Sequence, residues 1–367
     1  MTAAARSVPR PKAGIRAVAS AAVALAVAAT VLAALTASAA ADRLNPLRAA
    51  MAQLFASYQE ATGLIGNTWW QSAVALSTVE TYAQTTGDTT YDAAIEEAFD
   101  LNSGGSFENT SDDDTAWWGL AWLQAYDLTH RSSYLAMAET DANYIHEDWD
   151  STCGGGVWWQ RDPRSYKNAI TNELFLELTA WLHDTIHGDT KYLAWAKAEW
   201  SWFDHSGMIN KKNLINDGLD NNCKNNGQPT WTYNQGVILA GLAQLYRATG
   251  NHALLTEAER LADATVSQLS VGGVLTEPCT TDACTDRFGT PAQSFKGIFV
   301  SDLKVLAVTA GTRQFNAFFS TQARSIEARD TGAHHQFGVY WAGPIAGITS
   351  SSQASALQAL VAAVNLP

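Results

Sequence analysis

The amino-acid sequence predicts an all-α protein folded as an (α/α)6 barrel, with six inner and six outer helices. Two kinds of helix-like segment alternate along the chain. Segments of the first kind are rich in Ala and Leu and follow long polar loops that carry Trp. Segments of the second kind follow short turns and place apolar residues at i, i+3 and i+4. Helices that are apolar nearly all round belong inside a barrel, and amphipathic helices belong outside.

The boundaries of these segments are read from the same pattern. The predicted inner helices cover residues 70–86, 114–128, 168–186, 232–248, 293–309 and 353–365. The predicted outer helices cover residues 45–61, 91–101, 134–148, 191–204, 252–269 and 313–329. An open helical solenoid is the alternative, but it would show a more regular repeat than these segments do.

The short turns supply the stop signals between paired helices. Gly87, Gly188 and Gly250 each follow a helix-like segment, and Asp or Asn comes next, as expected where one helix ends and another is capped. All the long loops precede inner helices, so they should gather at one end of the barrel. Loops held by a rigid scaffold carry function, and we expect the chemistry at that end.

The first 41 residues are read separately, as a secretory signal peptide. Four basic residues precede an Ala/Val/Leu run from about residue 17 to 35, and cleavage is expected among Ala39 to Ala41. An uncleaved membrane anchor is the alternative, because the run is almost long enough to span a bilayer. No linker interrupts residues 42–367, so we predict a single secreted, extracellular catalytic domain with no later membrane segment.

The charge balance limits the class of ligand. Removing the four basic residues of the leader changes the net charge from −13 to −17. Such a chain repels phosphate backbones, so nucleic-acid binding is not expected. The balance suits a neutral polymer, and we expect a monomer with no cofactor.

All four cysteines lie in the exported part, where an even number indicates disulfides. We expect the pairs Cys153–Cys223 and Cys279–Cys284. A Cys₄ metal site is the alternative, but the C-x-x-C spacing that it needs is missing. No metal is therefore expected.

The segment 109–118 carries the strongest chemical signal, because Asp112, Asp113 and Asp114 precede a helix that continues with Trp117 and Trp118. Helix capping or a metal site could use such carboxylates, but three in a row exceed what a cap needs. Glycoside hydrolysis uses two carboxyl groups, and repulsion between neighbours raises the pKa of one so that it can act as the acid. The indoles are candidates for stacking on a sugar ring, with core packing as the alternative.

Other loops supply candidate substrate ligands of aromatic and amide type. Three glycines before Val157 permit a tight loop, and no phosphate-binding glycine pattern is present. The alternatives are helix capping for Asn168, aromatic loop packing for the segment at 231–236, and a solvated side chain for Lys296. The candidates are Trp69, Trp158, Trp159, Lys167, Asn168, Asn172, Trp231, Tyr233, Asn234, Gln235 and Lys296.

These segments together resemble glycoside hydrolase family 76, the endo-α-1,6-mannanases, over nearly the whole chain after the leader. The resemblance rests on the Asp pair with its two indoles at 113–118, on 154–159 with 167–173, and on 233–236 and 293–297. It implies an (α/α)6 barrel and hydrolysis of α-1,6-mannosidic bonds with retention, without a metal. Asp113 then resembles the nucleophile and Asp114 the acid/base.

The third aspartate, Asp112, means that the catalytic pair could be 112/113 or 113/114, and the spacing to Trp117 and Trp118 favours 113/114. Asp112 is then a candidate substrate ligand. Two other functions stay open: a transglycosylase that remodels a cell wall, and a non-catalytic mannan-binding protein. Trp117, Trp159 and Trp231 are the expected stacking residues.

Overall fold

The computed structural model describes residues 1–5, 44–278 and 291–366 of the 367-residue chain. The chain divides into two units, Met1–Arg48 and Ala49–Pro367. In the first unit residues 1–5 have no regular structure and residues 44–48 are helical. Most of the predicted leader and all of the predicted Cys279–Cys284 pair lie outside the described residues, so both stay predictions.

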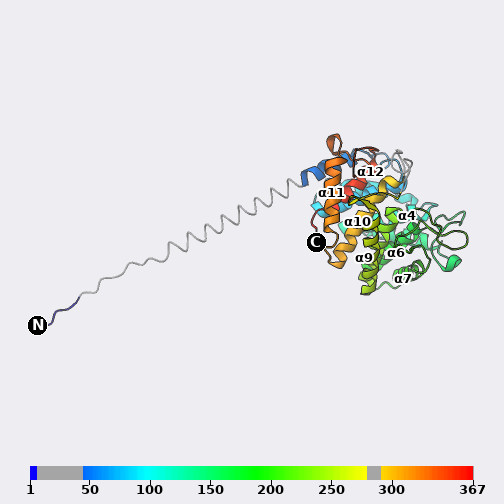
Figure 1. Ribbon diagram of the computed structural model, residues 1–367, viewed down its shortest axis with the longest axis horizontal. Helices are drawn as coiled ribbons and strands as arrows, with labels where there is room; N and C mark the ends of the chain where they lie inside the picture. The colour runs from blue at the N-terminus through cyan, green and yellow to red at the C-terminus, as the bar shows by residue number, and fades with distance from the viewer. Residues whose placement is uncertain (6–43, 279–290, 367) are drawn as a thin grey trace. The chain divides into compact units, whose positions relative to one another are not determined.

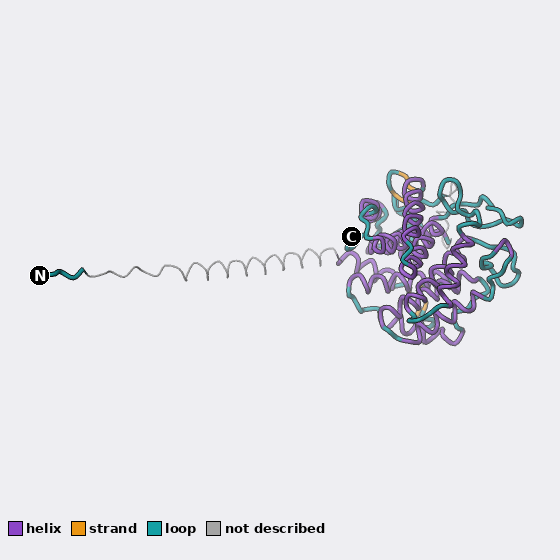
Figure 2. Tube along the Cα trace, turned by 90° about the horizontal axis from the view of Figure 1, so that it is seen from below, coloured by secondary structure: helices purple, strands orange, loops and turns teal. Residues whose placement is uncertain are grey.

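Helices dominate the second unit, as Figures 1 and 2 show. Six of them form a closed inner ring, in which each helix contacts the next and the last contacts the first. In ring order they are α2 (Trp69–Thr86), α4 (Asp112–Thr129), α6 (Ala169–Thr185), α8 (Thr232–Thr249), α10 (Ala292–Ala310) and α12 (Ser350–Ala362). The predicted (α/α)6 barrel is therefore confirmed.

The outer layer packs against this ring, mostly with each outer helix beside the inner helix that precedes it. Its first helical stretch ends at residue 55. The others are α3 (Asp92–Asn102), α5 (Ser132–His146), α7 (Lys191–Phe203), α9 (His252–Gln268) and α11 (Asn316–Arg329). Burial follows the predicted division, because α12 is buried all round whereas α9 buries one side only.

The turns between paired helices use the left-handed backbone conformation. Gly87 has φ 71°, and its N–H bonds to the carbonyl of Ala83 at 2.8 Å, which closes α2. Gly250 closes α8 in the same way with φ 68°. His130 takes this conformation at the end of α4, so glycine is favoured there but not required.

The first predicted outer helix is too long. It ends at residue 55 instead of 61, and Tyr58–Gln59 (β1) then pairs antiparallel with Leu64–Ile65 (β2). Gly63 turns this hairpin with φ 69°, and a Cβ there would lie 2.7 Å from the Cα of Ala98. A second small hairpin joins Ser270–Val271 (β3) to Val274–Leu275 (β4). Single-turn 3₁₀ helices lie at Ser103–Gly105, Thr152–Gly154 and Ala333–His335.

None of the helices in the described ranges combines the length and apolar character that a membrane span needs.

Candidate active site

A pocket of about 270 Å³ lies where the inner helices α2, α4, α8 and α10 begin and the loops before α6 and α8 pass. Its position confirms that the long loops gather at one end of the barrel. The residues that line it are Trp70, Ser111, Asp113, Asp114, Trp117, Trp159, Tyr166, Asn168, Asp217, Tyr233, Pro291 and Phe295.

The three consecutive aspartates at the start of α4 point in different directions. Asp113 and Asp114 are half-buried and line the pocket. Asp112 is completely buried, and its Oδ1 lies 3.7 Å from Nη1 of Arg161. Burial and the nearby Asp148 raise the pKa of Asp112 to about 9. A helix turns successive side chains by about 100°, so Asp113 and Asp114 face this pocket and Asp112 does not. A substrate contact by Asp112 stays a prediction.

Both aspartates that line the pocket have raised pKa values. Burial and the charge of Asp114 raise the pKa of Asp113 to about 8, although hydrogen bonds from Trp159 and from backbone N–H groups oppose this. Burial raises the pKa of Asp114 to about 6. Near neutral pH the pair therefore retains one proton, so one member is an acid while the other is ionised.

Each carboxylate has its own hydrogen-bond donor. Nε1 of Trp159 donates to Oδ1 of Asp113 at 3.0 Å. Nδ2 of Asn109 donates to Oδ2 of Asp114 at 2.9 Å. Trp159 thus contributes a hydrogen bond as well as an aromatic surface, which the sequence pattern did not indicate.

Aromatic side chains wall the pocket. Trp70 stacks on Trp117 with ring centroids 5.9 Å apart. Tyr233 stacks on Phe295 at 3.7 Å, and Trp231 meets the edge of the same Phe295 ring at 5.7 Å. Aromatic faces of this kind are suited to contact with the carbon-bound hydrogens of a sugar.

Asp217 and Tyr166 line the pocket, and sequence reasoning missed both as site residues. The hydroxyl of Tyr166 donates to Oδ2 of Asp217 at 2.5 Å, and Nδ2 of Asn226 donates to the same hydroxyl at 2.8 Å. Burial raises the pKa of Asp217, against the hydrogen bond from Tyr166. The run Ile-Asn-Asp-Gly at 215–218 gave no signal, because isolated Asp residues are common in polar loops.

Two of the predicted ligands hold a loop instead of facing the pocket. Nζ of Lys167 lies within 3.2 Å of five oxygen atoms, four of them backbone carbonyls. Asn172 is completely buried, and its amide pairs with both the N–H and the carbonyl of Val157. The polar atoms of both side chains are bonded inside the protein and neither residue lines the pocket, so their sugar contacts stay predictions.

Four further candidates are buried at the helix starts. Trp118 is fully buried among the aromatic rings between α4 and its neighbours. Asn234 is completely buried, and Gln235 bonds to the backbone of Ile215 in both directions. Nζ of Lys296 donates to the carbonyl of Val339 at 2.6 Å. None of these four residues lines the pocket, so their substrate contacts stay predictions. Core positions on inner helices look alike in sequence whether or not they reach the pocket.

Of the remaining candidates, some line the pocket and others do not. Asn168 lines the pocket and also caps α6, so the two readings of this residue are compatible. Trp69 packs on Trp118, and Nε1 of Trp158 donates to Asp150 at 2.9 Å. Trp69, Trp158 and Trp231 are half-buried beside the pocket and do not line it.

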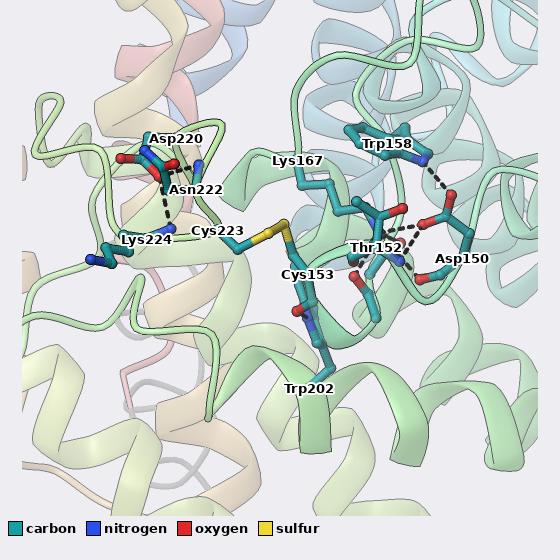
Figure 3. Close-up of a disulfide and its surroundings, with 12 residues drawn as sticks. Asp150, Thr152, Cys153, Trp158, Lys167, Trp202, Asp220, Asn222, Cys223 and Lys224 are labelled. Atoms are coloured by element: carbon teal, nitrogen blue, oxygen red, sulfur yellow. Dashed lines mark hydrogen bonds and ion pairs between the residues drawn. A yellow bond between two sulfur atoms is a disulfide. The ribbon is translucent and has the colours of Figure 1, made fainter.

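The disulfide Cys153–Cys223 is present as predicted, with its Cα atoms 5.1 Å apart. It joins the loop before α6 to the loop before α8, and Figure 3 shows it beside Lys167 and Trp202. Both loops supply residues to the pocket, so the disulfide ties together two of its walls.

A larger cavity of about 430 Å³ lies toward the other ends of the same inner helices. Its acidic residues, Asp127, Glu177 and Asp302, come from three different helices. It offers no adjacent pair of half-exposed carboxyl groups, so we place the chemistry in the smaller pocket.

Known proteins resemble this chain in sequence along most of its length. Residues 39–366 match Glycosyl hydrolase family 76. Mannan endo-1,6-alpha-mannosidase DCW1 of Saccharomyces cerevisiae is 27% identical over 301 residues, which cover 74% of this chain and 66% of that protein. Mannan endo-1,6-alpha-mannosidase DFG5 of Candida albicans is 28% identical over 259 residues, which cover 64% and 57%. The chain thus spans roughly half to two thirds of the length of these relatives.

Solved structures share the fold. The alpha-1,6-mannanase GH76A of Salegentibacter sp. HEL1_6 superposes with a TM-score of 0.79 at 22% identity, covering 89% of this chain and 99% of that one. Dfg5 from Chaetomium thermophilum gives 0.78 at 21% identity, covering 88% and 90%. With the family match over residues 39–366, these observations show that the chain belongs to glycosyl hydrolase family 76.

Proposed function

We propose that this protein is a retaining glycoside hydrolase that cleaves α-1,6-mannosidic linkages in mannan. One observation carries the proposal: of three consecutive aspartates, only Asp113 and Asp114 open into a pocket with aromatic walls. Adjacent carboxyl groups that retain one proton near neutral pH supply the acid and the nucleophile that retention needs.

The names of related proteins support the choice of substrate. The relatives from yeasts are described as mannan endo-1,6-alpha-mannosidases. The Salegentibacter mannanase is described as inactive once two consecutive aspartates are replaced, and it binds alpha-1,6-mannotetrose in that form. A consecutive pair of aspartates in the present pocket fits the same chemistry.

The proposed reaction has two steps. Asp114 gives its proton to the glycosidic oxygen while Asp113 attacks the anomeric carbon, so the leaving sugar departs and a mannosyl-enzyme ester forms. Asp114, now ionised, takes a proton from water, which attacks the same carbon and releases mannan with retained configuration. Asp113 is then a free carboxylate again, and the net reaction consumes one water.

The order of the two pKa values gives Trp159 a part in this reaction. In the empty pocket Asp113 has the higher pKa, about 8 against about 6 for Asp114. The proposed roles need the proton on Asp114 and the charge on Asp113. The hydrogen bond from Trp159 stabilises ionised Asp113 and so lowers the free-energy cost of the productive arrangement, although Asp113 keeps the higher pKa with this bond in place.

Asp217 and Tyr166 are proposed to bind sugar hydroxyl groups in the same pocket as the catalytic pair. Asp217 can accept hydrogen bonds while Tyr166 fixes its orientation from one side. Trp117 and Trp159 line the same pocket and are the proposed stacking surfaces.

Export of the protein is part of the proposal. The basic and apolar leader and the Cys153–Cys223 disulfide both suit a protein that folds outside the cytosol. Mass spectrometry of the N-terminus of protein recovered from the culture medium would test it, and a product that begins near Asp42 is expected.

The product profile from unbranched α-1,6-mannan tests the function. Shorter oligosaccharides whose new reducing ends appear first as the α-anomer, followed by proton NMR, are the expected result. Products longer than the donor would indicate transfer between chains, and binding without new reducing ends would indicate a non-catalytic protein.

A further inference from the structure

We propose that Lys167 is a positioning residue, whose ammonium group folds the loop 150–156 and thereby holds Trp159 in hydrogen-bond contact with Asp113. The catalytic consequence of this inference rests on the proposed function, whereas its structural part does not. Figure 3 shows the lysine side chain reaching into the loop beside the disulfide.

The ammonium group is enclosed by the loop. Nζ of Lys167 lies 2.8, 2.7 and 2.8 Å from the carbonyl oxygens of Thr152, Gly155 and Gly156, and 2.8 Å from Oδ1 of Asp150. The residue is only 2% exposed. A buried charge without these oxygens would be costly, so the loop must fold around the lysine whenever the lysine is charged.

Trp202 packs against the loop 150–156. The indole of Trp202 lies so close that a Cβ on Gly156, which has φ 87°, would meet its ring at 2.3 Å. Nε1 of Trp202 also donates to the carbonyl of Cys153 at 3.0 Å. The loop is therefore packed between an indole and an ammonium group, and glycine is required where the indole touches it.

Asp150 connects this loop to the two indoles that follow it. Its carboxylate accepts from Nζ of Lys167 and, at 2.9 Å, from both Nε1 of Trp158 and the N–H of Thr152. Burial acts to raise the pKa of Asp150, but these hydrogen bonds lower it below its ordinary value. The Trp158 ring lies 4.8 Å from the same ammonium group.

Trp159 is the next residue, and the neighbour of Lys167 holds its backbone. The N–H of Trp159 bonds to the carbonyl of Tyr166 at 2.8 Å, and its carbonyl accepts from the N–H of Asp112 at 2.9 Å. Lys167 thus fixes the chain before the Trp158–Trp159 pair, its neighbour Tyr166 holds the backbone of Trp159, and the indole of Trp159 reaches Asp113 from there.

The test uses Lys167→Met in the full chain and reads the indole N–H of Trp159 by ¹⁵N NMR, with the resonance assigned through Trp159→Phe. In the parent protein this resonance should titrate with Asp113, near pH 8. In Lys167→Met we expect the resonance to move toward the position of a solvent-exposed indole. Its midpoint should rise by about one pH unit, because a hydrogen bond to ionised Asp113 is weakened.

Lys304→Met is the matched control, because Lys304 donates to the carbonyls of Val364 and Asn365 and lines only the larger cavity. It should leave the Trp159 resonance and its midpoint unchanged. Should Lys167→Met fail to fold, Asp150→Asn removes the carboxylate charge that faces the lysine, and a smaller shift in the same direction is expected.

An unchanged Trp159 resonance and midpoint in a folded Lys167→Met or Asp150→Asn protein would overturn the proposal, even with lowered thermal stability. Parallel kcat/KM profiles on α-1,6-mannan should show the upper pH limit moving up with the NMR midpoint. Absence of mannanase activity in the parent protein would refute the proposed function alone, because the NMR readout needs no turnover.

Discussion

Replacing Trp159 by Phe isolates the hydrogen bond on which the proposed division of roles depends. The substitution keeps an aromatic ring in the pocket wall and removes the Nε1–H that lies 3.0 Å from Oδ1 of Asp113. A hydrogen bond to a charged group contributes about 1.5–3 kcal/mol. Since one pKa unit corresponds to about 1.4 kcal/mol, the pKa of Asp113 should rise by about one to two units.

The sign of the effect on activity follows from the singly protonated pair. Losing the donor destabilises ionised Asp113, so the proton shifts further from Asp114 toward Asp113 and the productive form becomes rarer. We expect kcat/KM at the optimum to fall about ten- to a hundredfold, because the lost hydrogen bond contributes about 1.5–3 kcal/mol and each 1.4 kcal/mol is about a factor of ten. The upper pH limit, where the last proton leaves, should move up by about one to two units. The lower limit, set by Asp114, should stay near 6.

The assay is kcat/KM on a defined α-1,6-mannooligosaccharide between pH 4 and 10. Trp70→Phe is the matched control, because Trp70 lines the same pocket and stacks on Trp117, whereas the indole hydrogen bond to Asp113 comes from Trp159. It should change KM and leave both pH limits in place. A Trp159→Phe profile that overlays the parent profile, or an upper limit that moves down, would refute the reasoning.

Four further outcomes follow from the same geometry. The parent enzyme should show a bell-shaped kcat/KM profile with limits near pH 6 and 8, and a single rising limb would contradict a shared proton. Asp113→Asn should lower kcat at least about ten-thousandfold, and Asp114→Asn about a hundred- to ten-thousandfold, in steady-state assays. Asp112→Asn should retain most activity, because burial keeps Asp112 protonated at neutral pH, and inactivity in a folded variant would shift the catalytic pair by one residue. Reducing Cys153–Cys223, which spans 70 residues, should lower the free energy of unfolding by about 4 kcal/mol in a denaturant titration; an unchanged midpoint would show that the two loops need no tether.

The architecture could be predicted from the sequence because helix periodicity and the residues that end helices are local signals. Alternation of Ala/Leu-rich and amphipathic segments predicted the inner and outer layers, and Gly87 and Gly250 marked helix ends where a left-handed residue is needed. The first outer helix was predicted too long because the hairpin that follows it depends on a contact that is distant in the sequence. Gly63 lies close to the Cα of Ala98, and no local sequence pattern indicates this contact.

The sequence predicted the adjacent carboxyl groups and several of the aromatic residues at the site. It did not predict which polar side chains line the pocket. Lys167 and Asn172 look like sugar ligands in sequence, since both lie in a polar loop beside two tryptophans. In the structure both side chains form hydrogen bonds with the backbone of the loop before α6. Asp217 gave no sequence signal, because its place in the pocket depends on how the loop before α8 folds back.

Trapping the mannosyl-enzyme tests the central claim most directly. A slowly hydrolysed fluorinated α-mannosyl donor would be incubated with the protein, and the labelled peptide would be sequenced by mass spectrometry. The account predicts a single mannosyl ester on Asp113. A label on Asp114 or Asp112, or inversion of configuration without any covalent label, would contradict it.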